Sequence, residues 1–162
     1  MSRWHLAAAG ACALLVAPAA DAADAKYVKL VHAETGKVLA VADDSDEAGA
    51  RAVLAKDEKG EARQWKLEKD GDHYKLVNRK SGKVLDVFEE SKDEGAPIIV
   101  WEDKPEGNDN QRWAWEGEGK ARRLKAKSSG LVLDVDDEGK LVQRKADGKA
   151  KGQLWRVAEV KE

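Results

Sequence analysis

Two of the three histidines and one acidic run are the side chains that could carry catalysis or hold a metal ion. His32 and His73 start or end expected strands without a nucleophile or a metal-spaced partner, so we interpret both as exposed strand-end residues. The run 43–47 begins like a calcium loop, but Ala48 and Leu54 stand where that loop needs glycine and glutamate. Nothing pairs two carboxylates for glycoside hydrolysis. We therefore expect a solvated loop, no metal, no cofactor and no enzyme activity.

Carbohydrate binding is a second chemistry that these residue types allow. Vicinal hydroxyls need a fixed acceptor, ideally a carboxylate that takes two charge-assisted hydrogen bonds. The C–H face of a pyranose needs a flat aromatic surface. The chain has 31 Asp and Glu residues and six Trp residues. Whether a sugar site exists therefore depends on which strands and turns bring an acid and a tryptophan together.

The overall charge excludes one class of partner. The 29 Lys and Arg residues nearly balance the acidic ones, and both signs are interleaved without a basic stripe for a phosphate backbone, so we expect no nucleic acid partner. A surface this rich in charge, at 37% of all residues, also argues against membrane insertion.

The first 22 residues are typical of a signal peptide. Arg3 supplies the positive charge, an apolar stretch runs from Leu6 to Val16, and residues 20–22 offer small side chains for cleavage, with 23–25 as a shifted site. The apolar run is shorter than the ~20 residues that span a bilayer. We expect cleavage and a protein that is secreted or periplasmic, without distinguishing the two.

Cys12 leaves an alternative open, a lipoprotein acylated on that thiol. The preceding residues are small, but Ala9 lacks a large aliphatic side chain and the apolar run continues past Cys12. After cleavage the mature chain contains no cysteine, so its stability cannot depend on disulfides.

The mature chain, residues 26–160, is one domain of three similar blocks, approximately 26–69, 72–117 and 120–160. Their turn glycines, at positions 36, 82 and 130, lie 46 and 48 residues apart. Each block closes on a Gln and a Trp, which we interpret as copies of one Gln-x-Trp motif: Gln64-Trp65, Gln111-Arg112-Trp113 and Gln153-Leu154-Trp155.

Short strands are expected within each block. Residues 74–77 and 112–115 alternate large apolar side chains with others, as a half-buried strand does, and residues 80–83 form a tight glycine turn. The charge spacing of residues 61–69 fits a helix, but the repeat register favours a strand there. Such strands and turns fit a barrel or a sandwich.

The three blocks resemble the ricin-type β-trefoil lectins over essentially the whole mature chain. The resemblance implies an all-β fold of three pseudo-symmetric four-stranded repeats, with six strands in a closed barrel and six in three capping hairpins. It makes Trp65, Trp113 and Trp155 core residues, each preceding Gln bonding nearby backbone. The cysteine pair of many family members is absent; valine stands at that position in each block: Val38, Val84 and Val132.

The second block carries the sugar-binding set that the resemblance implies. In these lectins the acid ends a Leu-Asp-Val strand, the aromatic comes from the next strand, and an Asn precedes the Gln. Here they are Asp86, Trp101 and Asn110, followed by Gln111. Some members bind sugar through a Gln where this chain has Ile99. The family suggests galactose-type glycans, but the sequence does not identify the sugar.

The other two blocks have lost this set. In the first block the acid, aromatic and amide are replaced by Ala40, by Leu54 or Ala55, and by Arg63. The third block keeps Asp134 only, with Gln143 or Arg144 and Gly152 at the other two positions. We therefore expect one competent site, whose monovalent affinity is weak unless an oligomer supplies avidity; the oligomeric state stays open.

Structural roles for the same residues remain as alternatives. Asp86 could cap the turn after its strand, and Trp101 could pack inside its hairpin. Glu102 and Asp103 could add a contact at the rim of a site. Two functions follow: a carbohydrate-binding module, or a trefoil that binds protein, such as an inhibitor or envelope interaction module.

Overall fold

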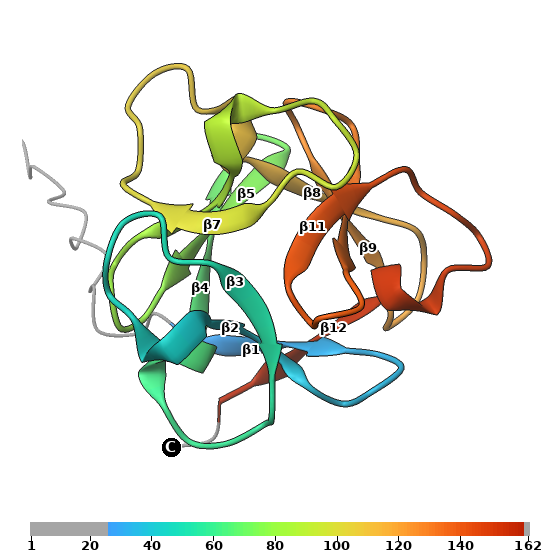
Figure 1. Ribbon diagram of the computed structural model, residues 1–162, viewed down its shortest axis with the longest axis horizontal. Coiled ribbons are helices and arrows are strands. Elements are labelled where there is room, and N and C mark those ends of the chain that lie inside the picture. The colour runs from blue at the N-terminus through green and yellow to red at the C-terminus, as the bar shows by residue number, and fades with distance from the viewer. Residues whose placement is uncertain (1–25, 161–162) are drawn as a thin grey trace, which may run out of the picture.

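The computed structural model describes residues 26–160, in which all the long elements are antiparallel β-strands (Figure 1). The expected signal peptide and Cys12 lie outside the described residues. The strands are β1 (Val28–His32), β2 (Val38–Val41), β3 (Ala52–Ala55), β4 (Trp65–Asp70), β5 (His73–Asn78), β6 (Val84–Val87), β7 (Ile98–Trp101), β8 (Trp113–Glu116), β9 (Arg123–Ala126), β10 (Val132–Val135), β11 (Leu141–Arg144) and β12 (Trp155–Glu159).

Six of these strands form a closed barrel. β1 pairs with both β12 and β4, β5 pairs with β4 and β8, and β8 pairs with β9. Arg122 and Trp155 close the ring between β9 and β12 through two backbone hydrogen bonds, each 2.9 Å long. Closure leaves no exposed sheet edge in the barrel.

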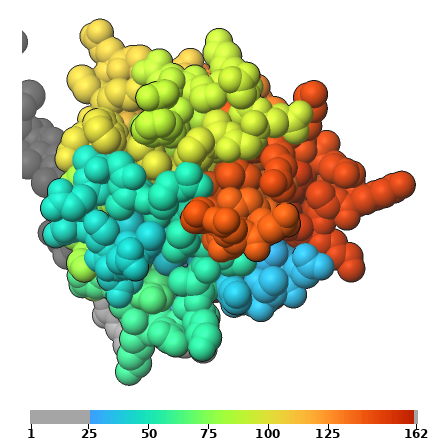
Figure 2. Space-filling view, viewed as in Figure 1, coloured from blue at the N-terminus to red at the C-terminus, as the bar shows by residue number. Residues whose placement is uncertain are grey.

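The other six strands form three hairpins that cap one end of the barrel. They are β2–β3, β6–β7 and β10–β11, and isolated bridges join each hairpin to the next: Arg51–Ile99, Pro97–Val142 and Val53–Lys140. Figure 2 shows the three repeats meeting at the centre of this face. The expected β-trefoil of three four-stranded repeats is confirmed.

Three buried tryptophans tie the barrel to its caps. Trp65, Trp113 and Trp155 are completely buried, as expected for core residues. Each indole Nε1 donates a hydrogen bond to the leucine carbonyl of its own repeat's first cap strand. The acceptors are Leu39, Leu85 and Leu133, at 3.0, 3.0 and 3.3 Å. Each buried Trp N–H thus has a hydrogen-bond acceptor, and each bond joins the barrel to the cap hairpin of the same repeat.

The turn glycines and the 61–69 segment behave as the repeat predicts. Gly36, Gly82 and Gly130 have φ of 71°, 69° and 71°, the left-handed region that glycine adopts without strain. Residues 61–69 form a single 3-10 turn, η3 (Glu61–Arg63), followed by β4, so the strand is confirmed over the helix.

The alignment of the first block on Gln-x-Trp is wrong. The 3-10 turns η3, η5 (Asp109–Gln111) and η6 (Lys151–Gln153) each end two residues before the core Trp. Arg63, not Gln64, therefore occupies the position of the motif's glutamine in the first repeat. Buried Ala62, not Arg63, occupies the asparagine position. Gln64 and Trp65 are adjacent, without the spacer residue.

His32 also differs from its expected role. It does end β1, but only 3% of it is exposed. Its ring lies 5.2 Å from the Trp155 ring, and its Nδ1 is 2.9 Å from the Thr35 hydroxyl. His73 begins β5 and is half-buried. Over residues 26–160, no helix has the length and apolarity to cross a membrane.

Candidate functional site

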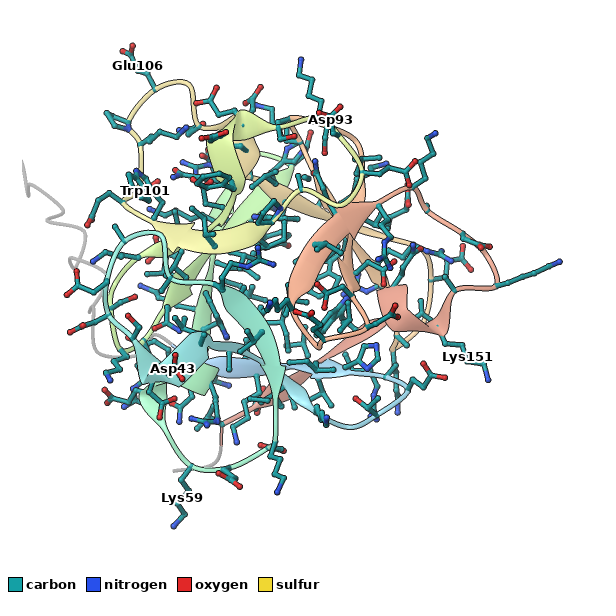
Figure 3. The ribbon with its side chains drawn as sticks, in the orientation of Figure 1. Asp43, Lys59, Asp93, Trp101, Glu106 and Lys151 are labelled. Carbon is teal, nitrogen blue, oxygen red and sulfur yellow. The ribbon has the colours of Figure 1, made fainter. Side chains whose placement is uncertain are left out.

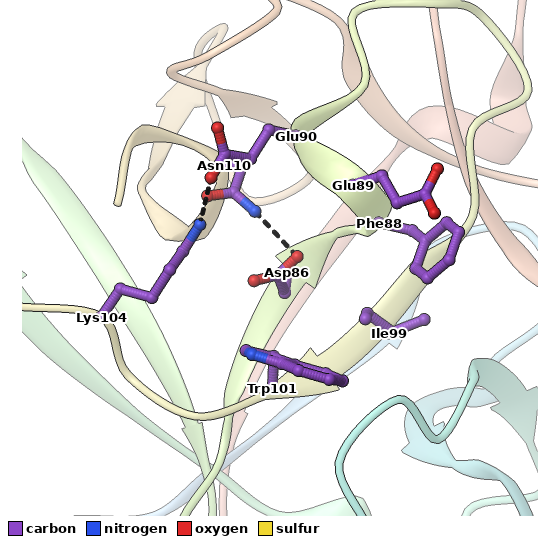
Figure 4. Close-up of a pocket in the computed structure, with 8 residues that line it drawn as sticks. All are labelled: Asp86, Phe88, Glu89, Glu90, Ile99, Trp101, Lys104 and Asn110. Atoms are coloured by element: carbon purple, nitrogen blue, oxygen red, sulfur yellow. Dashed lines mark hydrogen bonds and ion pairs between the residues drawn. The ribbon is translucent and has the colours of Figure 1, made fainter. Parts of the chain in front are cut away.

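A pocket of about 400 Å³ lies beside the second cap hairpin (Figure 4). Figure 3 shows one of its walls, Trp101, on the outer part of that hairpin. The lining residues come from β6, β7, the loop after β7 and the 3-10 turns η4 (Phe88–Glu90) and η5. They are Asp86, Phe88, Glu89, Glu90, Ile99, Trp101, Lys104 and Asn110.

Strand alternation places the acid and the aromatic on one face. Successive side chains of a strand point to opposite faces, so the core contacts of Leu85 and Val87 turn Asp86 away from the core. Asp86 lies opposite Ile99 in the hairpin, and Trp101 is two residues further along β7 on the same face. The hairpin thereby brings Asp86 and Trp101 to one pocket.

The Asp86 carboxylate is held by two side-chain amides. Asn110 Nδ2 donates to its Oδ1 at 2.8 Å and Gln111 Nε2 donates to its Oδ2 at 2.7 Å. Both donors lie in η5, so the interpretation of Asp86 as a cap of the turn after its strand is wrong. An ionised carboxylate has about four lone-pair sites, so each oxygen keeps an acceptor position.

The two amides are themselves fixed by backbone. Asn110 Nδ2 also donates to Val87 O at 3.0 Å. Gln111 Nε2 donates to Glu102 O at 2.8 Å, and its Oε1 accepts from Lys104 N at 2.9 Å. The expected backbone bonding of the motif's glutamine is confirmed for Gln111. Gln111 is fully buried and supports Asp86 from behind, whereas Asn110 lines the pocket.

Burial raises the pKa of Asp86 to about 6. Only 3% of the residue is exposed, and removing a carboxylate from water disfavours its charged form. The hydrogen bond from Gln111, the Lys104 charge and the bond from Asn110 act in the opposite direction, while Glu90 raises the pKa further. Asp86 is therefore ionised at neutral pH and changes charge just below it.

Trp101 forms an open aromatic wall. It is 42% exposed, so the interpretation that it packs inside its hairpin is wrong. A Cβ on Gly49 of the first repeat would lie 3.5 Å from its Cζ3, which places that loop against the ring. In Figure 4, Asp86 lies between Trp101 and Asn110. The pocket thus presents a fixed acceptor beside a flat apolar surface.

Sequence patterns did not identify Phe88, Glu89, Glu90 and Lys104 as pocket residues. The Lys104 Nζ and a Glu90 carboxylate oxygen form an ion pair at 2.6 Å on the pocket rim. Residues 88–90 directly follow Leu85-Asp86-Val87 in the sequence, and this position next to the expected acid could have identified these three as pocket residues. Glu102 and Asp103, expected at the rim, do not line the pocket; they pair with Lys83 and Lys75 at 3.2 and 2.8 Å.

The hairpin register settles the aromatic position in the other repeats. Trp101 pairs with Val84, and the equivalent valines pair with Ala55 and Arg144, not with Leu54 and Gln143. The first repeat therefore presents alanine at all three positions of the set: Ala40, Ala55 and Ala62.

The third repeat uses its aspartate locally. Asp134 accepts from Gln153 Nε2 at 3.1 Å and from Val135 N at 2.7 Å. Arg144 Nη1 stands 3.6 Å from the same carboxylate. A Cβ on Gly152 would lie 3.0 Å from Asp134 Oδ1, so an asparagine there requires the carboxylate to move.

Comparison with known proteins gives one family. Residues 3–101 match the family described as ricin-type beta-trefoil lectin domain-like. The designed three-fold symmetric protein ThreeFoil is 34% identical with a TM-score of 0.77, over 83% of this chain and 99% of that one. No curated protein sequence matches the chain.

Two natural proteins of known structure contain the same fold. The exo-β-1,3-galactanase from Clostridium thermocellum is 32% identical with a TM-score of 0.77, over 85% of this chain and 31% of that one. The Polyporus squamosus lectin, solved with Neu5Acα2-6Galβ1-4GlcNAc, is 20% identical with a TM-score of 0.71, over 81% of this chain and 48% of that one. The chain thus spans about a third and about half of these two proteins.

Proposed function

Because this chain belongs to the ricin-type β-trefoil lectin family, we propose that it binds glycans without catalysis, through one site in its second repeat. One observation carries the proposal. Asp86, a buried carboxylate with free acceptor positions, and Trp101, an exposed indole, line the same pocket. The first and third repeats lack an aromatic residue at the position of Trp101.

The two groups divide the recognition of a pyranose between them. Asp86 accepts hydrogen bonds from two neighbouring hydroxyls through the lone pairs that Asn110 and Gln111 leave free. Trp101 stacks on the C–H face of the ring. Ile99 offers only an apolar contact, so the carboxylate carries most of the polar recognition.

A galactose-type glycan is the proposed ligand class. The likeness to an exo-β-1,3-galactanase at 32% identity supports it, although this chain covers only 31% of that protein. Export to a secreted or periplasmic location, after removal of residues 1–22, is part of the same proposal. A single site per chain gives modest affinity, so avidity depends on several copies acting together.

A glycan array tests the proposal, with Trp101→Ala as the key variant. We expect the wild-type protein to bind galactose-containing glycans and Trp101→Ala to lose about 10-fold to 100-fold in affinity, because sugar stacking on the indole is lost. Arg144→Ala, at the equivalent position of the third repeat, is the matched control and should bind as wild type. If no glycan binds, the lectin proposal fails and the protein-binding alternative gains support.

The pKa of Asp86 predicts how binding depends on pH. The raised pKa of about 6 means that the accepting, ionised form predominates above pH 6 and is lost below it. Between about pH 7.5 and pH 5, we expect the Kd for the best array glycan to rise about tenfold. Isothermal titration calorimetry across this range measures it.

A variant identifies the titrating group. Lys104 lowers the pKa of Asp86, so Lys104→Gln should move the midpoint of the binding profile to higher pH. The loss of Lys104 also frees the Glu90 charge, which acts in the same direction. A Kd that stays constant from pH 7.5 to 5, or a midpoint unmoved by Lys104→Gln, would contradict this assignment.

A further inference from the structure

A second pocket, of about 370 Å³, opens between the β8–β9 hairpin and β12. It shares no residue with the pocket around Asp86. Its lining includes five apolar residues, among them Trp115 and Val157, and three cationic ones, Lys120, Arg122 and Arg156. No Asp or Glu is among the lining residues. The pocket therefore combines an apolar wall with a cluster of positive charges.

The pseudo-symmetry shows that Arg122 is an exception among equivalent positions. Three residues bridge to a core tryptophan of the neighbouring barrel strand, and they are Val28, Tyr74 and Arg122. The first is aliphatic and the second aromatic, and both pack against the core. Only the third repeat places a cation there, beside the bridge that closes the barrel.

Trp115 is the second exception. It pairs with Leu124 as Leu67 pairs with Leu76, so the second repeat has an indole where the first has leucine. The Arg122 guanidinium carbon lies 4.9 Å from the centre of the Trp115 ring, within the range of a cation–π contact. Val157, 40% exposed, is the equivalent residue of β12. Arg122 and Trp115, the two residues that depart from the repeat pattern, thus contact each other.

The three cations have no acidic partner in the described part of the chain. Neither an ion pair nor a side-chain hydrogen bond involves Lys120, Arg122 or Arg156 within residues 26–160. Four other arginines are paired with carboxylates at 2.6 to 3.6 Å, namely Arg63, Arg79, Arg112 and Arg144, and the guanidinium groups of Arg51 and Arg123 donate to backbone carbonyls. The guanidinium of Arg122 presents its donors as a planar fork that matches a carboxylate.

We infer that this pocket binds a small amphipathic carboxylate, its apolar body against Trp115 and Val157 and its carboxylate between Arg122 and the other two cations. An apolar anion satisfies both properties of the pocket, whereas a neutral apolar molecule leaves the cations unpaired and an inorganic anion makes no contact with the apolar wall. The inference is independent of glycan binding, because the two pockets have no residue in common.

Octanoate is the probe, and the indole N–H signal of Trp115 is the readout. In ¹H–¹⁵N correlation spectra of the mature protein, we expect octanoate to shift this signal in a saturable manner, and to leave that of Trp101 unmoved. Octanamide, its neutral analogue, should bind at least about tenfold more weakly, since the charge-assisted bonds are missing. Equal binding of the two probes, or no shift with octanoate, overturns the inference.

Substitutions of the three cations show which positive charges contribute to octanoate binding. Arg122→Gln should weaken octanoate about tenfold, and the double variant of the exposed residues, Lys120→Gln with Arg156→Gln, should weaken it without a folding risk. Arg79→Gln is the matched control, because Arg79 lies 4.5 Å from the Tyr27 ring in a similar contact outside this pocket. Wild-type affinity in both test variants, or an equal loss in Arg79→Gln, overturns the inference.

Discussion

Replacing Asp86 with asparagine should weaken glycan binding about 100-fold or more. A carboxylate accepts two charge-assisted hydrogen bonds from sugar hydroxyls, each contributing about 1.5–3 kcal/mol. The asparagine has one oxygen, and that oxygen is already sought by Asn110 and Gln111, whose amides donate to Asp86 at 2.8 and 2.7 Å. Titration calorimetry with the best array glycan measures the loss.

The third repeat supplies the control for this substitution. Asp134 is the equivalent aspartate and also accepts from the motif's glutamine, at 3.1 Å, but Arg144 and Gly152 replace its aromatic and amide partners. Asp134→Asn should bind glycan as wild type. Thermal denaturation confirms that both variants are folded. An Asp86→Asn protein that binds within about threefold of wild type would remove the basis of the proposed site.

Trp113→Ala should lower the free energy of unfolding by about 3–5 kcal/mol. Trp113 is completely buried, so its removal leaves a large cavity in the core. The substitution also removes the indole donor that Leu85 O accepts at 3.0 Å, between the barrel and the second cap hairpin. Urea denaturation followed by circular dichroism at 25 °C measures the change.

The same substitution at an exposed tryptophan shows how much of the stability loss comes from burial. Trp101 is 42% exposed, so Trp101→Ala should change the free energy of unfolding by less than about 1 kcal/mol. Trp113→Phe should fall between the two, because it keeps an aromatic ring but loses the hydrogen bond. Similar costs for Trp113→Ala and Trp101→Ala would contradict the assignment of Trp113 to the core.

The fold was predictable because its constraints repeat along the chain. The glycines at 36, 82 and 130 must adopt positive φ, and the three tryptophans must be buried with a hydrogen-bond partner. Each constraint is local to one block, and threefold recurrence makes chance agreement improbable. The acid and aromatic of the pocket, Asp86 and Trp101, could be found because the resemblance to the ricin-type lectins gives their places within a block.

The alignment error in the first repeat shows which of the two motif residues fixes the register. The indole of Trp65 is anchored to Leu39 O at 3.0 Å, so the tryptophan determines which residue occupies each position before it. The Gln64 side chain instead accepts a hydrogen bond from Arg79 at 2.8 Å, outside the bonding pattern of Gln111 and Gln153. Arg63 takes the position of the motif's glutamine and bonds Asp44 at 2.7 Å. Counting back from the tryptophan would have assigned Ala62 correctly.

The missed pocket residues lie in the segments that follow the two cap strands β6 and β7. Glu89 and Glu90 have φ of 54° and 56°, a left-handed conformation that no turn signal in their types indicates. Lys104 comes from the loop after β7, and its approach to Glu90 depends on the path of that loop. The contact between Lys104 and Glu90 is set by tertiary structure, so no sequence pattern predicts it.

The pairing of β1 with β12 imposes an order on folding. Five residue pairs, from Val28–Glu159 to His32–Trp155, join the first strand of the barrel to the last. During synthesis, β1 leaves the ribosome long before β12 has been translated. The backbone N–H and C=O groups of β1 that pair with β12 therefore have no partner until synthesis is nearly complete. We therefore expect the barrel to close only when the third repeat is complete, and a chain truncated before Trp155 to expose this edge of β1 to aggregation.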